Sequence, residues 1–461
     1  MSKTYRPYEP DQILLLPPSL KEWLPTGHLA HFLADTVERL DLSAITSVYE
    51  REKRGYPPYH PVMMTKVWLY AYSVGLSSSR KVERLVIEDV AFRMLAANNR
   101  PDFRTLADFR KRHLGALHGL FHQVLKLCQK AGLVKLGHVA IDSSKMKANA
   151  SKHKAMSYAR MKDELDRLLK EDIKRWFDEC DRVDAEEDKL YGPDKRGDEL
   201  PKELQDPETR KKKIEEALKE LEREAKEESE ARDKKIEALR KEDPEAAGKL
   251  KKKSPTPDPK AQKNFTDPDS RIMPAPGERT SFIQAYSCQA AVDDKAQIIV
   301  AADVTQQSAD NDFAVPMVGQ VAANTGRFPQ KTTMDAGFFS GKAVRDLEAF
   351  GVDPYICPDR VKHGDRRSVA PRGRIPAGLS MKERMRRKLS TKRGRAIYAL
   401  RKGVVEPVFG QIKQARGFRQ FLLRGLRKVK AEWALICTGH NLLKLWRAMT
   451  LGPPRRRPRL A

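Results

Sequence analysis

The sequence predicts a mixed α/β catalytic domain that is interrupted by a charged helical insertion and preceded by an all-helical region. Residues 1–135 place apolar side chains at helical spacing between proline and serine breaks. Short strand-like segments begin near residue 137 and return after residue 281. Between them, residues 160–260 hold 28 basic and 32 acidic side chains, a composition typical of solvated helices.

The net charge of the chain indicates a polyanionic partner. Its 461 residues hold 89 Lys and Arg against 63 Asp and Glu, which gives a formal net charge of +26. Hydrophobic residues make up 40% of the chain, enough to build cores for roughly two or three domains. Because residues 160–260 are net acidic, the basic excess lies elsewhere in the chain, and it favours nucleic acid as the partner. A ribosome-associated or merely solubilised basic protein is the alternative that charge alone leaves open.

The cysteines predict neither a zinc site nor a disulfide framework, because no two of them lie close together in the sequence. They are Cys128, Cys180, Cys288, Cys357 and Cys437. Such cysteine usage suits a reducing cytoplasm. The first residues lack the apolar core of a signal peptide, and no apolar run approaches the ~20 residues of a membrane span. We therefore expect a cytoplasmic protein that makes no membrane contact and is nucleoid-associated when on DNA.

The amino-terminal region is expected to form short helices joined by proline and serine turns. Pro61 occupies the favoured first turn of one helix, and serines 77–79 cap the next. Thr105 is expected to open a long helix that runs to residue 132. Short helices dotted with arginine are compatible with a helix-turn-helix-like DNA binder, and a plain helical bundle fits the pattern equally well.

Residues 156–261 are predicted to form an antiparallel helical hairpin that is inserted into the catalytic domain. Two apolar seams with coiled-coil spacing are separated by prolines, and residues 254–260 form the exit linker. The first seam consists of Leu169, Ile173, Trp176, Cys180, Val183 and Leu190, and the second, weaker one of Ile214, Leu218, Leu221 and Ala225. We expect the hairpin to serve protein–protein contact.

Alternating strands and helices are expected to complete the catalytic domain after the insertion. The strands are predicted at residues 281–292, 297–305, 331–335 and 354–357, and the helices at 312–323, 342–350 and 430–449. A segment at 360–402 holds 16 basic and 2 acidic residues, so we expect a loop-rich, phosphate-facing region there, with a solvated basic loop as the alternative. Helix is expected again from Arg395 to about Arg416.

Three acidic residues stand where carboxylates can converge. Asp142 and Asp335 each end a predicted strand, and Glu406 lies on a helix. Carboxylates at strand ends and on a crossing helix can meet at one edge of an α/β sheet. Hard oxygen ligands suit Mg²⁺, and two such ions can support in-line phosphoryl transfer. Taken singly, each residue has an ordinary structural alternative, namely two turn-forming aspartates and a solvated helix glutamate.

The chain resembles the insertion-sequence DDE transposases with an InsH-type amino-terminal domain and an RNase H-like catalytic domain. The resemblance runs from about Asp11 to Trp446. Its amino-terminal motifs are DQILLLPPSLKEWLP, GHLAHFLADTVERLDL, YHPVMMTKVWLYAYSVGLSSSRKVERL and PDFRTLADFRKRH. Its catalytic motifs are AIDSSKMKANAS, TDPDSRIMP, AYSCQAAVDD, MDAGF and VEPVFGQIK.

The resemblance implies a metal-binding catalytic triad at Asp142, Asp335 and Glu406, holding two Mg²⁺ ions for which Mn²⁺ can substitute. It implies recognition of terminal inverted repeats in double-stranded DNA, strand cleavage by water and strand transfer into target DNA. Because two ends must be brought together, it also implies a homodimer on DNA. The rival interpretations are an RNase H-like nuclease and a catalytically inactive DNA-binding protein derived from a transposase.

The Tyr-Arg-Glu-Lys signature of related enzymes is present with a changed spacing. Its members would be Tyr398, Arg401, Glu406 and Lys413, but four residues separate Arg401 from Glu406 where three are usual. Lys402 has the usual spacing, so the sequence leaves open which residue takes the arginine role. On one helix kinked at Pro407, Tyr398, Lys402, Glu406 and Lys413 would share a face. Ser143 also departs from the glycine that often follows the first aspartate.

DNA contacts are expected from this signature and from the basic segment. The residues concerned are Tyr398, Arg401, Lys402, Lys413, Arg384, Arg386 and Arg387. Together these expectations divide the chain into four parts. They are a helical DNA-binding domain at 1–135, a split catalytic domain at 136–155 and 262–449, the hairpin at 156–261, and a disordered basic tail at 450–461.

Overall fold

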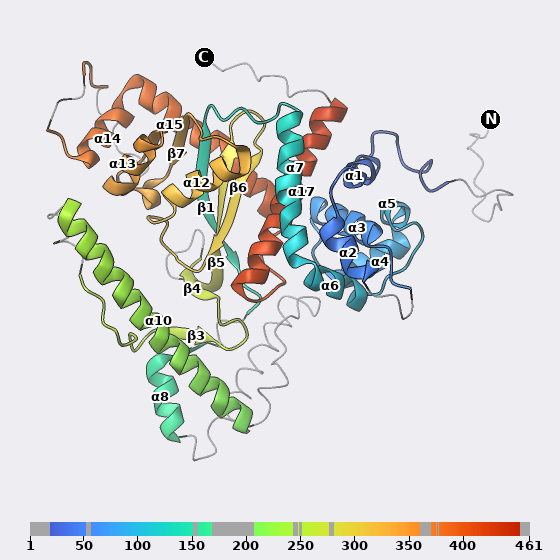
Figure 1. Ribbon diagram of the computed structural model, residues 1–461, viewed down its shortest axis with the longest axis horizontal. Coiled ribbons are helices and arrows are strands. Elements are labelled where there is room, and N and C mark those ends of the chain that lie inside the picture. Colours follow the sequence, from blue (N-terminus) through green and yellow to red (C-terminus); the bar gives the residue numbers. More distant parts are fainter. Residues whose placement is uncertain are drawn as a thin grey trace, which may run out of the picture. The chain divides into compact units, whose positions relative to one another are not determined.

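The computed structural model describes two compact units. The described residues are 19–51, 57–150, 155–167, 207–242, 248, 251–275, 281–359, 370–374, 376 and 378–451. The first unit comprises the described residues up to Ala116 and those from Trp446 onward, and the second spans Leu117–Leu445 (Figure 1). The first predicted seam of the hairpin and nearly all of the predicted tail lie outside the described residues.

The first unit is built from short helices, as the proline and serine breaks in its sequence predict. They are α1 (Leu29–Glu38), α2 (Ser43–Glu50), α3 (Pro61–Ser73), α4 (Ser79–Glu88), α5 (Val90–Leu95), α6 (Phe103–Arg112) and the beginning of α7 (Leu114–Lys130). Pro61 is the first residue of α3, and the Ser78 hydroxyl accepts from the Lys81 N–H to cap α4. The long helix predicted from Thr105 is wrong, because the Asp102 cap begins α6 at Phe103 and the helix is interrupted at His113 before α7 starts.

An arginine lies inside this first unit and not on its surface. Arg110 is buried, with its guanidinium 4.5 Å from the ring centre of the buried Trp68. It donates to the Tyr72 hydroxyl at 2.9 Å and to the Ser77 carbonyl at 2.6 Å. A buried charge needs such partners, so Arg110 ties α3, α6 and the turn before α4 together. It is therefore not part of a DNA-facing surface.

The second unit is organised around a six-stranded mixed sheet among its described residues. The strands are β1 (Val139–Lys147), β4 (Arg271–Pro274), β5 (Phe282–Asp293), β6 (Ile299–Thr305), β7 (Lys331–Met334) and β8 (Asp353–Ile356). Strand β5 runs antiparallel to β1, β4 and β6, whereas β7 runs parallel to both β1 and β8. This order, with β1 at the centre, is consistent with the RNase H-like fold that the resemblance implies.

Helices complete the core around this sheet. Helix α12 (Ala314–Thr325) connects β6 to β7, and α13 (Gly341–Ala349) connects β7 to β8. Helix α17 (Leu426–Leu451) lies beside α7 in Figure 1 and is pinned to the sheet by buried side chains. Trp433 donates to the Gln289 carbonyl at 3.1 Å, and the Asn441 amide pairs with both backbone groups of Ile299 at 2.9 Å. These bonds fix β5, which pairs with the central β1, and β6, which pairs with β5.

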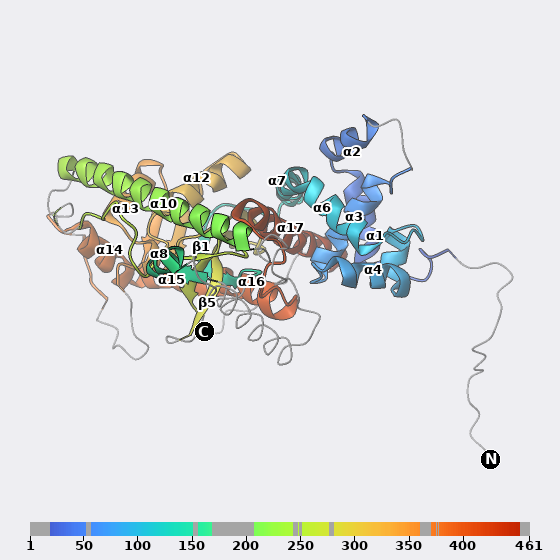
Figure 2. The same cartoon turned by 90° about the horizontal axis from the view of Figure 1, so that it is seen from below.

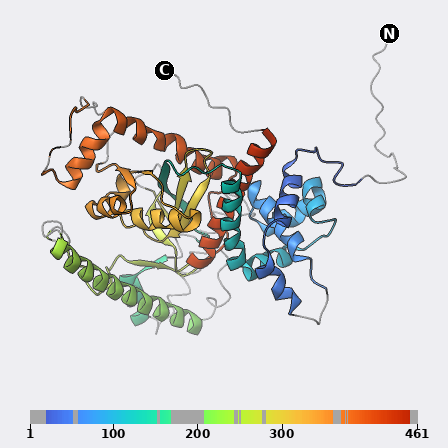
Figure 3. The same cartoon turned by 45° about the horizontal axis from the view of Figure 1, so that its top comes forward.

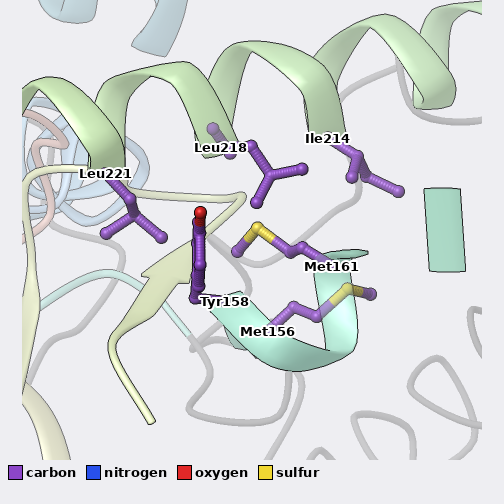
Figure 4. Close-up of a cluster of buried hydrophobic side chains, with 7 residues drawn as sticks. Met156, Tyr158, Met161, Ile214, Leu218 and Leu221 are labelled. Atoms are coloured by element: carbon purple, nitrogen blue, oxygen red, sulfur yellow. The ribbon is translucent and has the colours of Figure 1, made fainter. Parts of the chain in front are cut away.

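The insertion begins and ends at a small two-stranded ribbon. Strand β2 (Ala155–Ser157) pairs with β3 (Gln262–Asn264), and helices α8 (Tyr158–Arg167) and α10 (Pro207–Glu242) lie side by side next to it (Figures 1 and 2). Side chains from both helices and from β2 form one buried apolar cluster (Figure 4). Its members are Met156, Tyr158, Met161, Ile214, Ala217, Leu218 and Leu221. Three of the four residues of the predicted second seam, Ile214, Leu218 and Leu221, are thus buried against α8, whereas Ala225 is only half-buried.

The basic segment is more helical than its glycines and prolines suggest. Helices α14 (Met381–Ser390) and α15 (Lys392–Val404) follow one another along it, coloured orange in Figure 3. Ser380 and Glu383 form a reciprocal capping box that begins α14. The prediction of a loop-rich region is therefore wrong for residues 381–394, because a strong helix start outweighs the composition, while the helix predicted from Arg395 is present.

Two further expectations concern cysteines and membranes. The described cysteines, Cys128, Cys288, Cys357 and Cys437, are all free thiols. Among the described residues, no helix combines the length and the apolar character that a membrane span requires.

Candidate active site

The sheet places Asp142 and Asp335 side by side. Strands β1 and β7 pair in parallel, with Ala140 opposite Thr333. Asp142 lies two residues after Ala140, and Asp335 lies two residues after Thr333. Both aspartates therefore stand at the same level and on the same face of the sheet. Asp142 does not end its strand as predicted, because β1 continues to Lys147 through its pairing with β5. Asp335 does follow the last residue of β7.

A short turn holds the Asp335 side chain. Its Oδ1 accepts from the Gly337 N–H at 2.9 Å and so caps the 3₁₀ helix η4 (Ala336–Phe338). A Cβ added at Gly337 would lie 3.1 Å from that same oxygen and 3.4 Å from Asp310 Oδ2. Glycine therefore lets two carboxylates close over this turn. The turn-forming role that the sequence offered as an alternative for Asp335 is present, together with its place in the carboxylate cluster.

Arg401 joins the third acidic residue to the first. Its guanidinium donates to Asp142 Oδ2 at 2.7 Å and lies 3.4 Å from Glu406 Oε1. The side chains of Arg401 and Asp142 are 13% and 16% exposed, whereas that of Glu406 is 48% exposed. The Arg401–Asp142 pair is therefore largely shielded from water, and Glu406 lies at its solvent side.

A helix break explains how the changed spacing is accommodated. On a regular helix, residues five apart point about 140° away from each other. Here α15 ends at Val404 and α16 (Glu406–Gly410) begins after the single residue Val405, followed by a π-helical turn at Gln411–Ala415. Val405 keeps helical backbone angles, so the kink predicted at Pro407 takes the form of an interruption two residues before it. With this interruption, Arg401 is the basic residue that contacts both Asp142 and Glu406.

The other signature residues separate into two groups. Arg401 lies 5.9 Å from the ring centre of the half-buried Tyr398, and burial raises the pKa of that phenol far above its ordinary value. Lys413 donates to the Ser144 hydroxyl and to the Lys145 carbonyl at 2.6 Å, so it braces β1 just beyond Asp142. Lys402 is exposed, and the basic side chain that contacts Asp142 and Glu406 is that of Arg401, so Lys402 does not join this group as the predicted stripe requires.

Burial shapes the electrostatics of the site. Desolvation raises the pKa of the Asp142 carboxyl to about 6, although the Arg401 guanidinium opposes the shift. The negative charge of Asp335 adds to the increase. Burial lowers the pKa of the Arg401 guanidinium, but the fields of Asp142 and the other neighbouring acidic groups together outweigh that loss, and the net pKa is raised. The negative charge of the carboxylates at the site thus exceeds the positive charge of its single arginine.

Asp310 is an acidic neighbour that the sequence analysis did not single out. Its Oδ2 accepts from the Ser143 hydroxyl at 2.8 Å, and the negative charge of Asp335 contributes to raising its pKa after the larger effect of burial. It lies in the loop between β6 and α12, in a stretch without regular periodicity. The loop follows β6, which pairs with β5 beside β1, so the sheet brings Asp310 to the site and no local sequence signal could have identified it.

The arginines of α14 are occupied within the protein. Arg386 forms an ion pair with Asp359 at 2.7 Å, and Arg384 lies 3.5 Å from Glu348. Arg387 donates to the carbonyls of Arg372 and Arg374. Their predicted role in DNA binding stays a prediction, but each would have to exchange or share a partner to fulfil it.

The donor chemistry of the site fits a divalent cation. Carboxylate oxygens are the hard ligands that Mg²⁺ prefers, and the buried Asp310 Oδ1 has no hydrogen-bond partner of normal geometry. As the described side chains stand, however, no three His, Cys, Asp or Glu residues are grouped so that they could hold one ion. The Arg401 guanidinium, which lies against Asp142 and Glu406, carries positive charge there.

Comparison with known protein families identifies two segments of the chain. The family model of the Transposase DDE domain matches residues 260–442, and that of the Transposase domain (DUF772) matches residues 18–112. The chain belongs to the insertion-sequence DDE transposases. No curated protein and no solved structure matches it.

The proposed site residues of the transposase fall partly inside and partly outside the matched segments. Asp335 and Glu406 lie inside the DDE segment, whereas Asp142 precedes it and is separated from it by the insertion. The second matched segment covers α1 to α6 of the first unit. Membership of this family points to DNA as the partner and to an enzyme that cuts and joins DNA strands.

Proposed function

We propose that the transposase binds the terminal inverted repeats of an insertion sequence and carries out strand cleavage and strand transfer with the carboxylates Asp142, Asp335 and Glu406. The observation that carries this proposal is the register of β1 and β7, which sets two aspartates level on one face of the sheet. Glu406 is connected to that pair through Arg401. Three carboxylates drawn from three separate segments of the chain serve no common packing purpose.

The three carboxylates would hold two Mg²⁺ ions, for which Mn²⁺ can substitute. When bound, such ions activate the attacking oxygen and stabilise the leaving oxygen of an in-line displacement. The Asp142 side chain is only 16% exposed and its backbone is fixed within β1, so it is the anchor of the set. Glu406 is exposed and follows a helix break, so its side chain can turn inward when Arg401 moves toward a DNA phosphate.

The remaining residues position the DNA backbone. A guanidinium makes paired hydrogen bonds to phosphate, which suits Arg401 at the edge of the carboxylate cluster. Tyr398 is stacked near it, and Lys413 holds the strand that bears Asp142 in place. Arg384, Arg386, Arg387 and Lys402 would contribute longer-range attraction to DNA. Two ends must be joined in one reaction, so we propose a homodimer on DNA.

Strand-transfer assays test this function against its rivals. The DNA flanking the gene supplies the candidate inverted repeats, and the full chain is incubated with end DNA, a target plasmid and Mg²⁺. We expect cleaved ends and joined products. Cleavage without joining would support an RNase H-like nuclease, and end binding without any metal-dependent cleavage would support a DNA-binding protein that has lost catalysis. Either result would overturn the proposal.

A further inference from the structure

A buried polar cluster lies on the opposite face of β1 from the Asp142 side chain. Successive residues of a strand point to opposite faces, so Ser143 points away from the side that carries Asp142. Its hydroxyl donates to Asp310 Oδ2 at 2.8 Å. Gln289 is the cross-strand partner of Ser143 on β5 and is fully buried. Ser143, Gln289 and Asp310 thus form one group next to the active strand.

This cluster is short of partners in a way that ordinary packing does not explain. Neither the Oδ1 of Asp310 nor either amide atom of Gln289 has a hydrogen-bond partner of normal geometry among the described residues. Buried polar atoms normally find partners, because leaving them unpaired costs free energy. The Gln289 amide is a neighbour of the Asp310 carboxylate, but these atoms keep unused bonding capacity, which a cation at Asp310 Oδ1 would take up.

The cluster adjoins Asp335 around the end of β7. Strand β7 stops at Met334, so beyond it no strand continues beside β1 on that side among the described residues. A Cβ added at Gly337 would lie 3.4 Å from Asp310 Oδ2 and 3.1 Å from Asp335 Oδ1, so both carboxylates border the space beside this glycine. The negative charges of neighbouring carboxylates repel one another, and a bound cation would relieve that repulsion.

We propose that Asp310 is a fourth carboxylate of the divalent-metal site and acts together with Asp335. Ser143 is its positioning residue, because it holds Oδ2 and leaves Oδ1 for the ion. The serine after the first aspartate, where related enzymes often carry glycine, thereby gains a role that glycine could not fill. The inference rests on the proposed function, since it adds a ligand to the same metal site.

Metal binding by the full chain tests the assignment. Mn²⁺ affinity is measured by calorimetry for the wild type, Asp310→Asn and Asp312→Asn, a matched change at an exposed residue of the same loop. Loss of a carboxylate at or next to a metal should weaken Mn²⁺ binding by about 10-fold to 100-fold. Asp312→Asn should bind as the wild type does. Ser143→Ala should weaken binding less than Asp310→Asn, because it keeps the carboxylate.

The melting temperature without metal separates a ligand from a structural residue. Asparagine still accepts the Ser143 hydrogen bond and removes the repulsion from Asp335, so Asp310→Asn should melt at the wild-type temperature or higher. Wild-type Mn²⁺ affinity in Asp310→Asn would overturn the inference, and so would weakened affinity together with a lower metal-free melting temperature. Asp142→Asn is measured in parallel. If it also keeps wild-type affinity, the proposed function fails; if it alone loses affinity, only the role of Asp310 does.

Discussion

Arg401 holds Asp142 by an ion pair of 2.7 Å while it lies 3.4 Å from Glu406. One guanidinium thus connects the first and third acidic residues of the proposed triad in the metal-free protein. Its side chain is only 13% exposed, so this contact is not an ordinary surface pair. A cation that enters between these carboxylates must compete with Arg401, and a DNA phosphate offers Arg401 an alternative partner.

The first prediction is that Arg401→Gln lowers end-DNA affinity and cleavage far more than Lys402→Gln does. Arg401 is directed into the carboxylate cluster, whereas Lys402 is exposed beyond it. Gel-shift and cleavage assays on end DNA measure both effects. Equal losses in the two variants would show that the helix break does not select Arg401. Arg401→Lys should recover little, because an ammonium lacks the planar fork of donors.

The second prediction concerns stability and pH in the absence of metal. Burial raises the pKa of Asp142 to about 6, above its value in an unfolded chain. The folded state therefore prefers the protonated acid, so stability should fall as pH rises from about 4 to about 6, by roughly 2–3 kcal/mol. Asp142→Asn should remove this part of the pH dependence. Chemical denaturation in EDTA measures the difference, and identical pH profiles for the two proteins would contradict the burial of Asp142.

The third prediction concerns the insertion. Leu218 is buried between α8 and α10, so Leu218→Ala should destabilise the insertion by about 2–5 kcal/mol. Limited proteolysis should then cut near α10 first, while the catalytic sheet stays protected. The matched control is the exposed Lys219→Ala, which should leave the pattern unchanged. If Leu218→Ala gains no new cleavage sites, the cluster does not hold the insertion together.

The fourth prediction ranks the basic residues by how they are paired. Each phosphate contact that is lost should reduce the salt slope of log affinity by ~0.9 for duplex DNA. No ion pair of Lys402 is found among the described residues, whereas Arg386 is paired with Asp359 at 2.7 Å. Lys402→Gln should therefore flatten the slope more than Arg386→Gln. A larger effect for Arg386→Gln would mean that its ion pair opens on DNA.

Much of the architecture could be predicted because its signals are local. Pro61 and Ser78 begin α3 and α4 as their types require, and the burial of Leu218 follows from its spacing along α10. Strand β7 also ends at Met334, directly before the predicted site residue Asp335. Such features depend on a few neighbouring residues, so a single sequence contains them.

The rest of the fold and of the site depends on contacts between residues far apart in the sequence, which local sequence patterns do not predict. The extent of β1 beyond Asp142 is set by its pairing with β5, about 150 residues away. Asp310 reaches the site only through the fold of the sheet. The spacing between Arg401 and Glu406 is compatible with several helix geometries, so the sequence does not determine where the helix is interrupted before Glu406. The bonding of Arg110 inside the first unit likewise follows from tertiary packing.

The most direct test of the account compares end-DNA binding with cleavage in Asp142→Asn, Asp335→Asn and Glu406→Gln. These nearly isosteric changes leave the phosphate-binding residues in place and remove negative charge near DNA. Asp346→Asn is the control, because it loses only a surface pair with Lys342 on α13. The measurement is Mg²⁺-dependent cleavage of labelled end DNA beside a gel-shift assay for each variant. We predict that all three variants bind as well as the wild type or slightly better, while cleavage falls by several orders of magnitude without additive effects. Cleavage at the wild-type rate in any one of them would contradict the role of that residue, and in all three it would contradict the mechanism.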